Sequence, residues 1–180
     1  MVVAREAGVK DPDVDRCIAT ASGFLRWYVD KGAIPYGDHE PWAGHDNNGV
    51  NSQVAVLFDL MGDKEATDYF TRTTLASYRI REAGHTGHFF SWHWGALGAA
   101  RGGPEAAQSF IRNTRWFTEL ERRPGGGSVN QLQLYTKRGQ HYRGWSTTGS
   151  RLLQHCLPRK KLYITGKGGS CIDPIKGADL

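Results

Sequence analysis

Two stretches of this chain match each other at an offset of 40 residues: Gly44-His45-Asp46-Asn47-Asn48-Gly49 and Gly84-His85-Thr86-Gly87-His88-Phe89, each with the sequence that follows it. Over residues 44–80 and 84–120, nine of 37 aligned positions are identical, which is more than chance matching gives. The matches fall on turn and apolar positions: Gly44/Gly84, His45/His85, Leu57/Leu97, Gly62/Gly102, Glu65/Glu105, Ala66/Ala106, Phe70/Phe110, Arg72/Arg112 and Thr74/Thr114. The pattern indicates a duplicated structural unit.

Each copy has the pattern of two helices joined by a tight turn. In the first copy, apolar residues at helical spacing predict a helix over 50–61, which Gly62 ends. Asp63 is a good N-cap for a second helix. The second copy repeats this arrangement with a small-residue-rich helix over 92–101 and a helix over 104–120 that begins with a proline.

The flanking segments look like partial copies of the same unit. A helix opened by Asp11 precedes the pair, and a helix near 147–157 follows it. We therefore expect an all-α fold of repeated helical hairpins that forms part of an α/α toroid or an open helical array. Residues 1–167 form one domain, with repeat units at about 44–83 and 84–124, and residues 168–180 form a C-terminal tail. Because hairpins of this kind need neighbours, another domain of a longer chain or a second copy of this chain is an expected partner.

Composition and charge limit the function classes. The chain of 180 residues is 39% hydrophobic and 23% charged, which is typical of a folded, soluble domain, and no apolar run is long enough to cross a membrane. Residues 1–110 carry 10 Lys and Arg against 14 Asp and Glu, whereas residues 111–180 carry 13 against four. The basic residues are spread over predicted helix faces and the tail, so we expect solvated surfaces and no nucleic-acid partner. The sequence names no cofactor and no cellular compartment.

Three segments carry a resemblance to a known family: 44–49, 84–95 (Gly-His-Thr-Gly-His-Phe-Phe-Ser-Trp-His-Trp-Gly) and 144–149 (Gly-Trp-Ser-Thr-Thr-Gly). They resemble the helical C-terminal region of an uncharacterised bacterial family. That family looks like part of the α/α-toroid superfamily, which includes squalene cyclases, protein prenyltransferase β subunits and, more remotely, six-hairpin glycosidases. The resemblance covers about residues 12–167 and implies a fold more than an activity. The acidic motif of the cyclases and the zinc-ligand spacing of the prenyltransferases are missing from this sequence.

The repeat predicts a polar rim. If each hairpin places the start of its first helix at one end of the array, the residues before those helices converge. We expect this rim to bind or process a carbohydrate-like or other small polar ligand through aromatic stacking and hydrogen bonds. The expected ligand-binding residues are His45, Asn47, Asn48, His85, Trp92, His93, Trp94, Arg143 and Trp145. Asp46 or Glu40, with His88, would supply general acid and base groups if the domain is an enzyme, which the sequence leaves undecided.

Two other interpretations of the same residues stay open. His85, His88 and His93 with Asp46 offer metal ligands, but no recurrent metal motif appears, so we assign no metal residues. Histidine in the turn before a helix also caps backbone N–H groups, and duplication is what such a structural role predicts. A noncatalytic scaffold or protein-interaction domain, itself a fragment of a longer protein, is therefore the alternative function.

Overall fold

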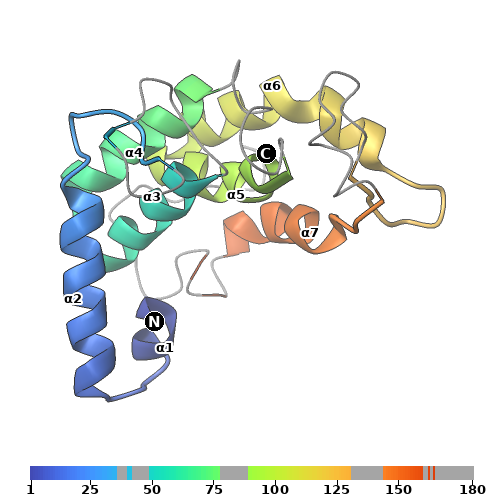
Figure 1. The fold of residues 1–180 in the computed structure, drawn as a ribbon. Helices are drawn as coiled ribbons and strands as arrows, with labels where there is room; N and C mark the ends of the chain where they lie inside the picture. The colour runs from blue at the N-terminus through green and yellow to red at the C-terminus, as the bar shows by residue number, and fades with distance from the viewer. Residues whose placement is uncertain are drawn as a thin grey trace.

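The computed structural model describes residues 1–35, 40–41, 49–77, 89–130, 144–159, 162 and 164. The α-helices in these ranges are α1 (Val2–Glu6), α2 (Pro12–Arg26), α3 (Val50–Met61), α4 (Lys64–Ala76), α5 (Phe89–Ala99), α6 (Pro104–Glu121) and α7 (Thr148–Cys156), with two 3₁₀ turns, η2 (Ala100–Gly102) and η4 (Leu157–Arg159) (Figure 1). The paired β-structure in the same ranges is two isolated antiparallel bridges, Arg122 with Ser128 and Val129 with Ser146. The described part of the chain is therefore all-α, as expected.

The α3–α4 hairpin forms as its sequence predicts. Gly62 ends α3 in the left-handed conformation, with φ 76°, where an L side chain would be strained. The Asp63 carboxylate then caps α4 by accepting from the Ala66 amide at 3.0 Å. Across the hairpin, the buried rings of Phe58 and Phe70 stack with centroids 5.8 Å apart. The local turn signals and the apolar stripe thus both favour the observed α3–α4 hairpin.

The α5–α6 hairpin has the same layout at the expected offset. Pro104 occupies the first turn of α6, and η2 leads into it from α5. The start of α3 lies against the start of α5, because a Cβ on Gly49 would come within 2.6 Å of the Phe90 carbonyl oxygen. A Cβ on Gly98 would likewise lie 2.7 Å from Ser52 Cα. The small residues of α5 therefore allow its backbone to approach α3 closely.

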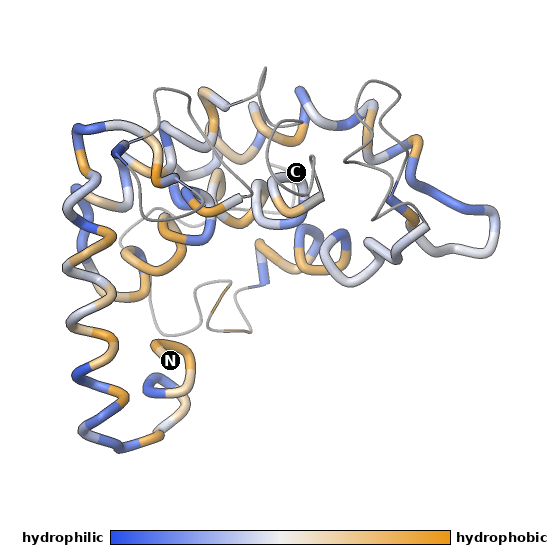
Figure 2. Tube along the Cα trace, in the orientation of Figure 1, coloured by the Kyte–Doolittle hydropathy of each residue, from blue (hydrophilic) through white to orange (hydrophobic). Residues whose placement is uncertain are grey.

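A buried ion pair joins the two hairpins. Arg101 in η2 places its Nε 3.1 Å from a carboxylate oxygen of Asp59 in α3, and both side chains are almost completely buried. Arg101 also donates to the carbonyl oxygens of Leu97 and Ile164, at 3.2 and 2.6 Å. Figure 2 shows apolar residues along much of α3, but buried polar side chains lie in this region too: Thr71 of α4 donates to the Gly98 carbonyl oxygen at 3.3 Å.

The N-terminal helices extend away from this core (Figure 1). Asp11 caps α2 as predicted, by accepting from the Asp13 amide at 2.8 Å. Ile18 is buried, whereas Phe24 and Trp27 are about half exposed. Arg26 fixes the end of α2 by pairing with Asp63 and Glu65. The sequence analysis did not predict the short helix α1.

The last described helix, α7, packs against α5 and faces the end of α6. No helix within the described ranges combines the length and the hydropathy that a membrane span requires. The fold thus leaves α6 and α7 as the two walls of one region.

Candidate anion-binding cleft

A cleft of about 650 Å³ lies between the C-terminal half of α6, the turn that follows it and α7. The side chains of α6 that line it recur at helical spacing, at positions 111, 115, 118, 119 and 122. Residues 123, 124 and 126–128 contribute the turn, and Thr148, Arg151, Leu152, Gln154 and His155 contribute the opposite wall. One face of α6 and one face of α7 therefore enclose a volume suited to a small ligand.

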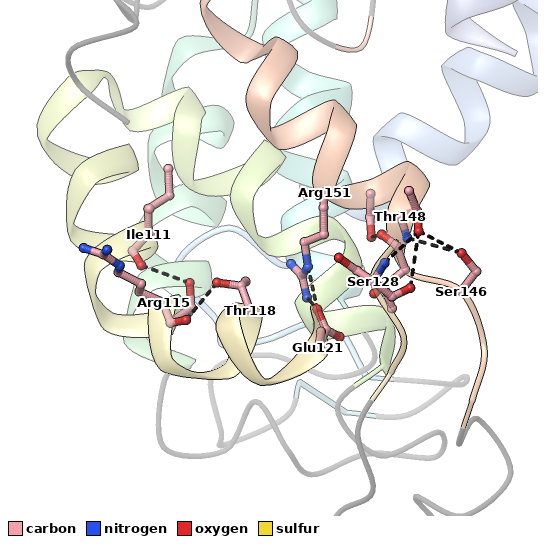
Figure 3. Close-up of polar contacts among 11 residues, drawn as sticks. Ile111, Arg115, Thr118, Glu121, Ser128, Ser146, Thr148 and Arg151 are labelled. Carbon is pink, nitrogen blue, oxygen red and sulfur yellow. Dashed lines mark hydrogen bonds and ion pairs between the residues drawn. The ribbon is translucent and has the colours of Figure 1, made fainter. Parts of the chain in front are cut away.

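Backbone hydrogen bonds hold the turn between the two helices. Arg123 donates its amide to the Gly127 carbonyl oxygen at 2.8 Å, and Gly126 donates back to the Arg123 carbonyl oxygen at 2.9 Å. Figure 3 shows the hydroxyl of Thr148 next to Ser128, whose amide donates to that hydroxyl at 2.9 Å. The Thr147 amide also donates to the Ser128 carbonyl oxygen, at 3.0 Å. The turn is thus tied to the start of α7, which fixes the width of the cleft at this end.

Four arginines line the cleft: Arg115, Arg122, Arg123 and Arg151. Arg122 pairs on the surface with Glu119, Nη1 to Oε2 at 2.9 Å. Arg151 pairs with the buried carboxylate of Glu121, and its Nε donates to Oε2 at 2.6 Å (Figure 3). Within the described part of the chain, Arg115 and Arg123 form no ion pair with a carboxylate, although the charge of Arg123 acts on Glu121. The cleft therefore carries an excess of positive charge, and guanidinium groups stay ionised at all ordinary pH values.

Glu121 lies behind Arg151 and is completely buried. Burial raises the pKa of its carboxyl above the usual range, although the charge and hydrogen bond of Arg151, the Thr147 hydroxyl and the charge of Arg123 all act to lower it. The Thr147 hydroxyl lowers the pKa of Glu121 although it makes no hydrogen bond of good geometry with the carboxylate. Oε1 of Glu121 has no hydrogen-bond partner among the described residues. Desolvation of the charged form is the larger effect.

His93 in α5 belongs to the same electrostatic surroundings. Its side chain is half-buried, and burial lowers its pKa, with a smaller contribution from the positive charge of Arg151. Both effects favour the neutral imidazole at neutral pH. His93 therefore adds no positive charge to this region.

The predicted rim residues fall into two groups. His45, Asp46, Asn47, Asn48, His85, His88 and Arg143 lie outside the described residues. The described members are dispersed: Glu40 is exposed, Trp145 is half exposed just before α7, and Trp92, His93 and Trp94 follow one another on α5. The expected roles of both groups in ligand binding stay predictions.

The two α5 tryptophans point to different neighbours because residues two positions apart on a helix face directions about 160° apart. Trp92 is 3% exposed and stacks on Phe117 of α6, with ring centroids 4.4 Å apart. Trp94 lines a separate apolar pocket of about 300 Å³, between α5 and the helices α1, α2 and α3. The structure therefore does not bring these two rings to one surface.

Sequence reasoning missed the cleft. It identified the basic half of the chain but assigned its arginines to solvated helix faces. The available signal was the recurrence of Ile111, Arg115, Thr118 and Arg122 along one face of α6. What the sequence could not supply was that α7, 30 residues away, faces this row. Within the described ranges no three His, Cys, Asp or Glu side chains gather as a metal site would need.

Comparison with known proteins gives one family. The model of a family described as "Domain of unknown function (DUF6288)" matches residues 1–166, so this chain belongs to that family. The comparisons with curated proteins and with solved structures gave no match.

Proposed function

We propose that this domain binds an anionic, polar ligand in the cleft between α6 and α7. The observation that carries the proposal is the presence in one cleft of Arg115 and Arg123, neither of which forms an ion pair with a carboxylate in the described part of the chain. Exposed arginines often lack an acidic partner, so what distinguishes these two is that they converge with Arg122 and Arg151 on one cleft. Here two are left over, beside two that are paired.

The physical basis is the chemistry of the guanidinium group. It offers five N–H donors in a planar fork, which matches two oxygens of a carboxylate or of a phosphate. Several like charges along the walls of a concave surface also raise the local concentration of anions. In the proposed role no protein group gains or loses a proton, and the proposal therefore assigns no catalytic step.

A carbohydrate-like ligand with acidic groups fits the remaining lining of the cleft. The hydroxyls of Thr118 and Thr148 and the amide of Gln154 can exchange hydrogen bonds with ligand hydroxyls. The side chains of Ile111 and Leu152 offer apolar surface for the C–H face of a sugar ring. We keep the α/α-toroid assignment as part of this proposal, since the described helices form the two hairpins that the repeat predicted.

The test is calorimetric titration of the full chain, at low ionic strength, with an oligosaccharide in which uronate and neutral sugar residues alternate and with a neutral oligosaccharide of the same length. We expect the acidic oligomer to bind and the neutral one to bind at least about tenfold more weakly. The double variant R115A/R123A should lose that preference. The matched control is Arg112→Ala, which removes an exposed arginine of the same helix that does not line the cleft. Equal binding by the two oligomers, or equal losses in R112A and R115A/R123A, would refute the proposal.

A further inference from the structure

We propose that the ligand of this cleft carries two anionic groups about 10 Å apart, with an uncharged segment between them. This inference rests on the proposed function and deepens it, because it specifies how charge is distributed along the ligand. It follows from the order in which charged side chains occur along α6 and the turn after it.

The first observation is the spacing of the cations. Arg115 lies in α6 and Arg122 is the residue that directly follows the helix, seven positions later; both line the same cleft, about two helical turns apart. At a rise of 1.5 Å per residue, their Cα atoms are separated by about 10 Å along the helix axis. Arg123 follows directly and adds a second guanidinium at the Arg122 end. The cleft therefore has a positive group at one end and a positive pair at the other.

The second observation is what lies between the two ends. Thr118 and Glu119 line the cleft between Arg115 and Arg122. The carboxylate of Glu119 neutralises Arg122 in part, and it repels any negative group placed midway along the cleft. A hydroxyl at this position would meet the Thr118 side chain instead. The pattern of charge along α6 is thus positive, negative, positive, and its complement is a ligand with negative ends and a neutral middle.

The third observation concerns the opposite wall. Gln154 of α7 lines the cleft, is 8% exposed, and has no hydrogen-bond partner for its amide oxygen among the described residues. An amide presents a donor or an acceptor according to its rotation, so it can meet a hydroxyl group of either orientation. Beside it, Leu152 is largely exposed and apolar. Gln154 and Leu152 therefore suit the uncharged middle of a ligand, whereas Arg151 on the same wall is already paired with Glu121.

The charge pattern selects against two classes of competing ligand. A small anion with one negative group can engage one end only, and therefore loses the contribution of the other. A polyanion with closely spaced charges must place one of them against Glu119. Oligomers in which acidic residues alternate with neutral ones satisfy the pattern, and this is the class of ligand that we infer.

Rigid dicarboxylates test the spacing directly. The long probe is para,para-biphenyldicarboxylate, the short probe is terephthalate, and the singly charged reference is para-biphenylcarboxylate. All three are titrated into the full chain by calorimetry at low ionic strength. We expect the long probe to bind at least about tenfold more tightly than the other two, because it alone reaches both cationic ends.

Variants identify the groups responsible. Arg115→Ala should reduce the affinity for the long probe to that of the singly charged reference and leave the reference unchanged. Arg112→Ala should change neither. Glu119→Gln should raise the affinity for terephthalate more than that for the long probe, since it removes the repulsion between the two ends.

The outcomes separate the inference from the function on which it rests. If all three probes bind with equal affinity and R115A weakens them equally, the anion site stands and the inferred spacing is wrong. If the short probe binds more tightly than the long one, the spacing is wrong as well. If no anion binds at any ionic strength, the proposed function itself fails.

Discussion

Two buried ion pairs stabilise two regions of this molecule, and they differ in the further contacts that their arginines make. In the α3–α5 region, Arg101 pairs with Asp59 and spends further donors on the carbonyl oxygens of Leu97 and Ile164. In the α6–α7 region, Arg151 pairs with Glu121 and also lines the cleft. The first arginine is 3% exposed and the second 11%. A sealed pair stabilises the contact between two hairpins, whereas an open one contributes charge to a surface that a ligand can reach.

The packing around the two pairs differs in the same way. Gly98 brings the backbone of α5 within contact distance of Ser52 in α3, so no ligand-sized space remains there. Between α6 and α7 the side chains are long, charged and separated by a cleft of about 650 Å³. Small residues therefore allow close packing at the α3–α5 interface, whereas side chains of like charge line the open cleft between α6 and α7. Burial of an ion pair alone therefore does not show whether its arginine has a structural or a ligand-binding role. The partners of the remaining N–H donors of that arginine do.

The largest expected effect comes from breaking the sealed pair. Asp59→Ala leaves Arg101 buried without its carboxylate, and should lower the free energy of unfolding by about 3–5 kcal/mol. Urea denaturation followed by circular dichroism measures it. The control is Asp68→Ala, which removes an exposed pair with Arg72 and should lower it by less than about 1 kcal/mol. Equal losses in the two variants would show that the Asp59–Arg101 pair is no more important than a surface contact.

A smaller loss should follow from separating α5 and α3. Gly98→Ala puts a Cβ 2.7 Å from Ser52 Cα and 2.8 Å from the Ser52 carbonyl oxygen, and backbone atoms cannot move aside as a flexible side chain can. We expect about 1–3 kcal/mol of destabilisation. Gly23→Ala in α2 meets no atom within 4 Å and should stabilise the protein slightly, because alanine favours a helix over glycine. A neutral G98A variant would contradict the close packing of the two helices.

The open pair should reveal itself through pH. Because the pKa of Glu121 is raised in the folded state, the folded protein binds more protons than the unfolded chain between the unfolded and folded pKa values. The contribution of Glu121 to stability is therefore fully present below its unfolded pKa and declines as pH rises through the folded pKa. Urea midpoints of the wild type and Glu121→Gln, measured across that range, should differ progressively. A difference that stays constant, or changes with the opposite sign, would contradict this account of Glu121.

The smallest effect on stability is expected at the unpaired arginines. R115A/R123A removes two exposed cations that line one cleft, and should change the free energy of unfolding by no more than about 0.5 kcal/mol. At low ionic strength the change should be a gain, because like charges repel, and added salt should abolish it. A large loss of unfolding free energy at every salt concentration would mean that these arginines stabilise the fold and are not a ligand-binding pair.

The sequence predicted the local structure well because its signals are local. Asp11 and Asp63 cap their helices, Gly62 ends α3 and Pro104 opens α6, each through atoms a few residues away. The contact between the starts of α3 and α5 also followed from the duplication. The short helix α1, which has no cap and no periodic stripe, was missed for the same reason.

The candidate site was less accessible to sequence reasoning because it depends on distant segments. Trp92 and Trp94 were placed correctly on one helix, but their directions depend on Phe117 in α6 and on the helices α1 to α3. Arg151 acquires its role from Glu121, 30 residues earlier. A charge count over residues 111–180 detects the excess of arginine and lysine but cannot tell which of them converge on one cleft.

The most direct test follows the arginine side chains themselves. We propose a nuclear magnetic resonance titration of the full chain, labelled at arginine Nε, with the oligosaccharide of alternating uronate and neutral residues. The account predicts that the Nε–H signals of Arg115, Arg123 and Arg151 shift together and saturate, while those of Arg101 and Arg112 stay unchanged. Shifts of similar size at all arginines, or at none, would contradict the claim that the cleft between α6 and α7 is an anion-binding site.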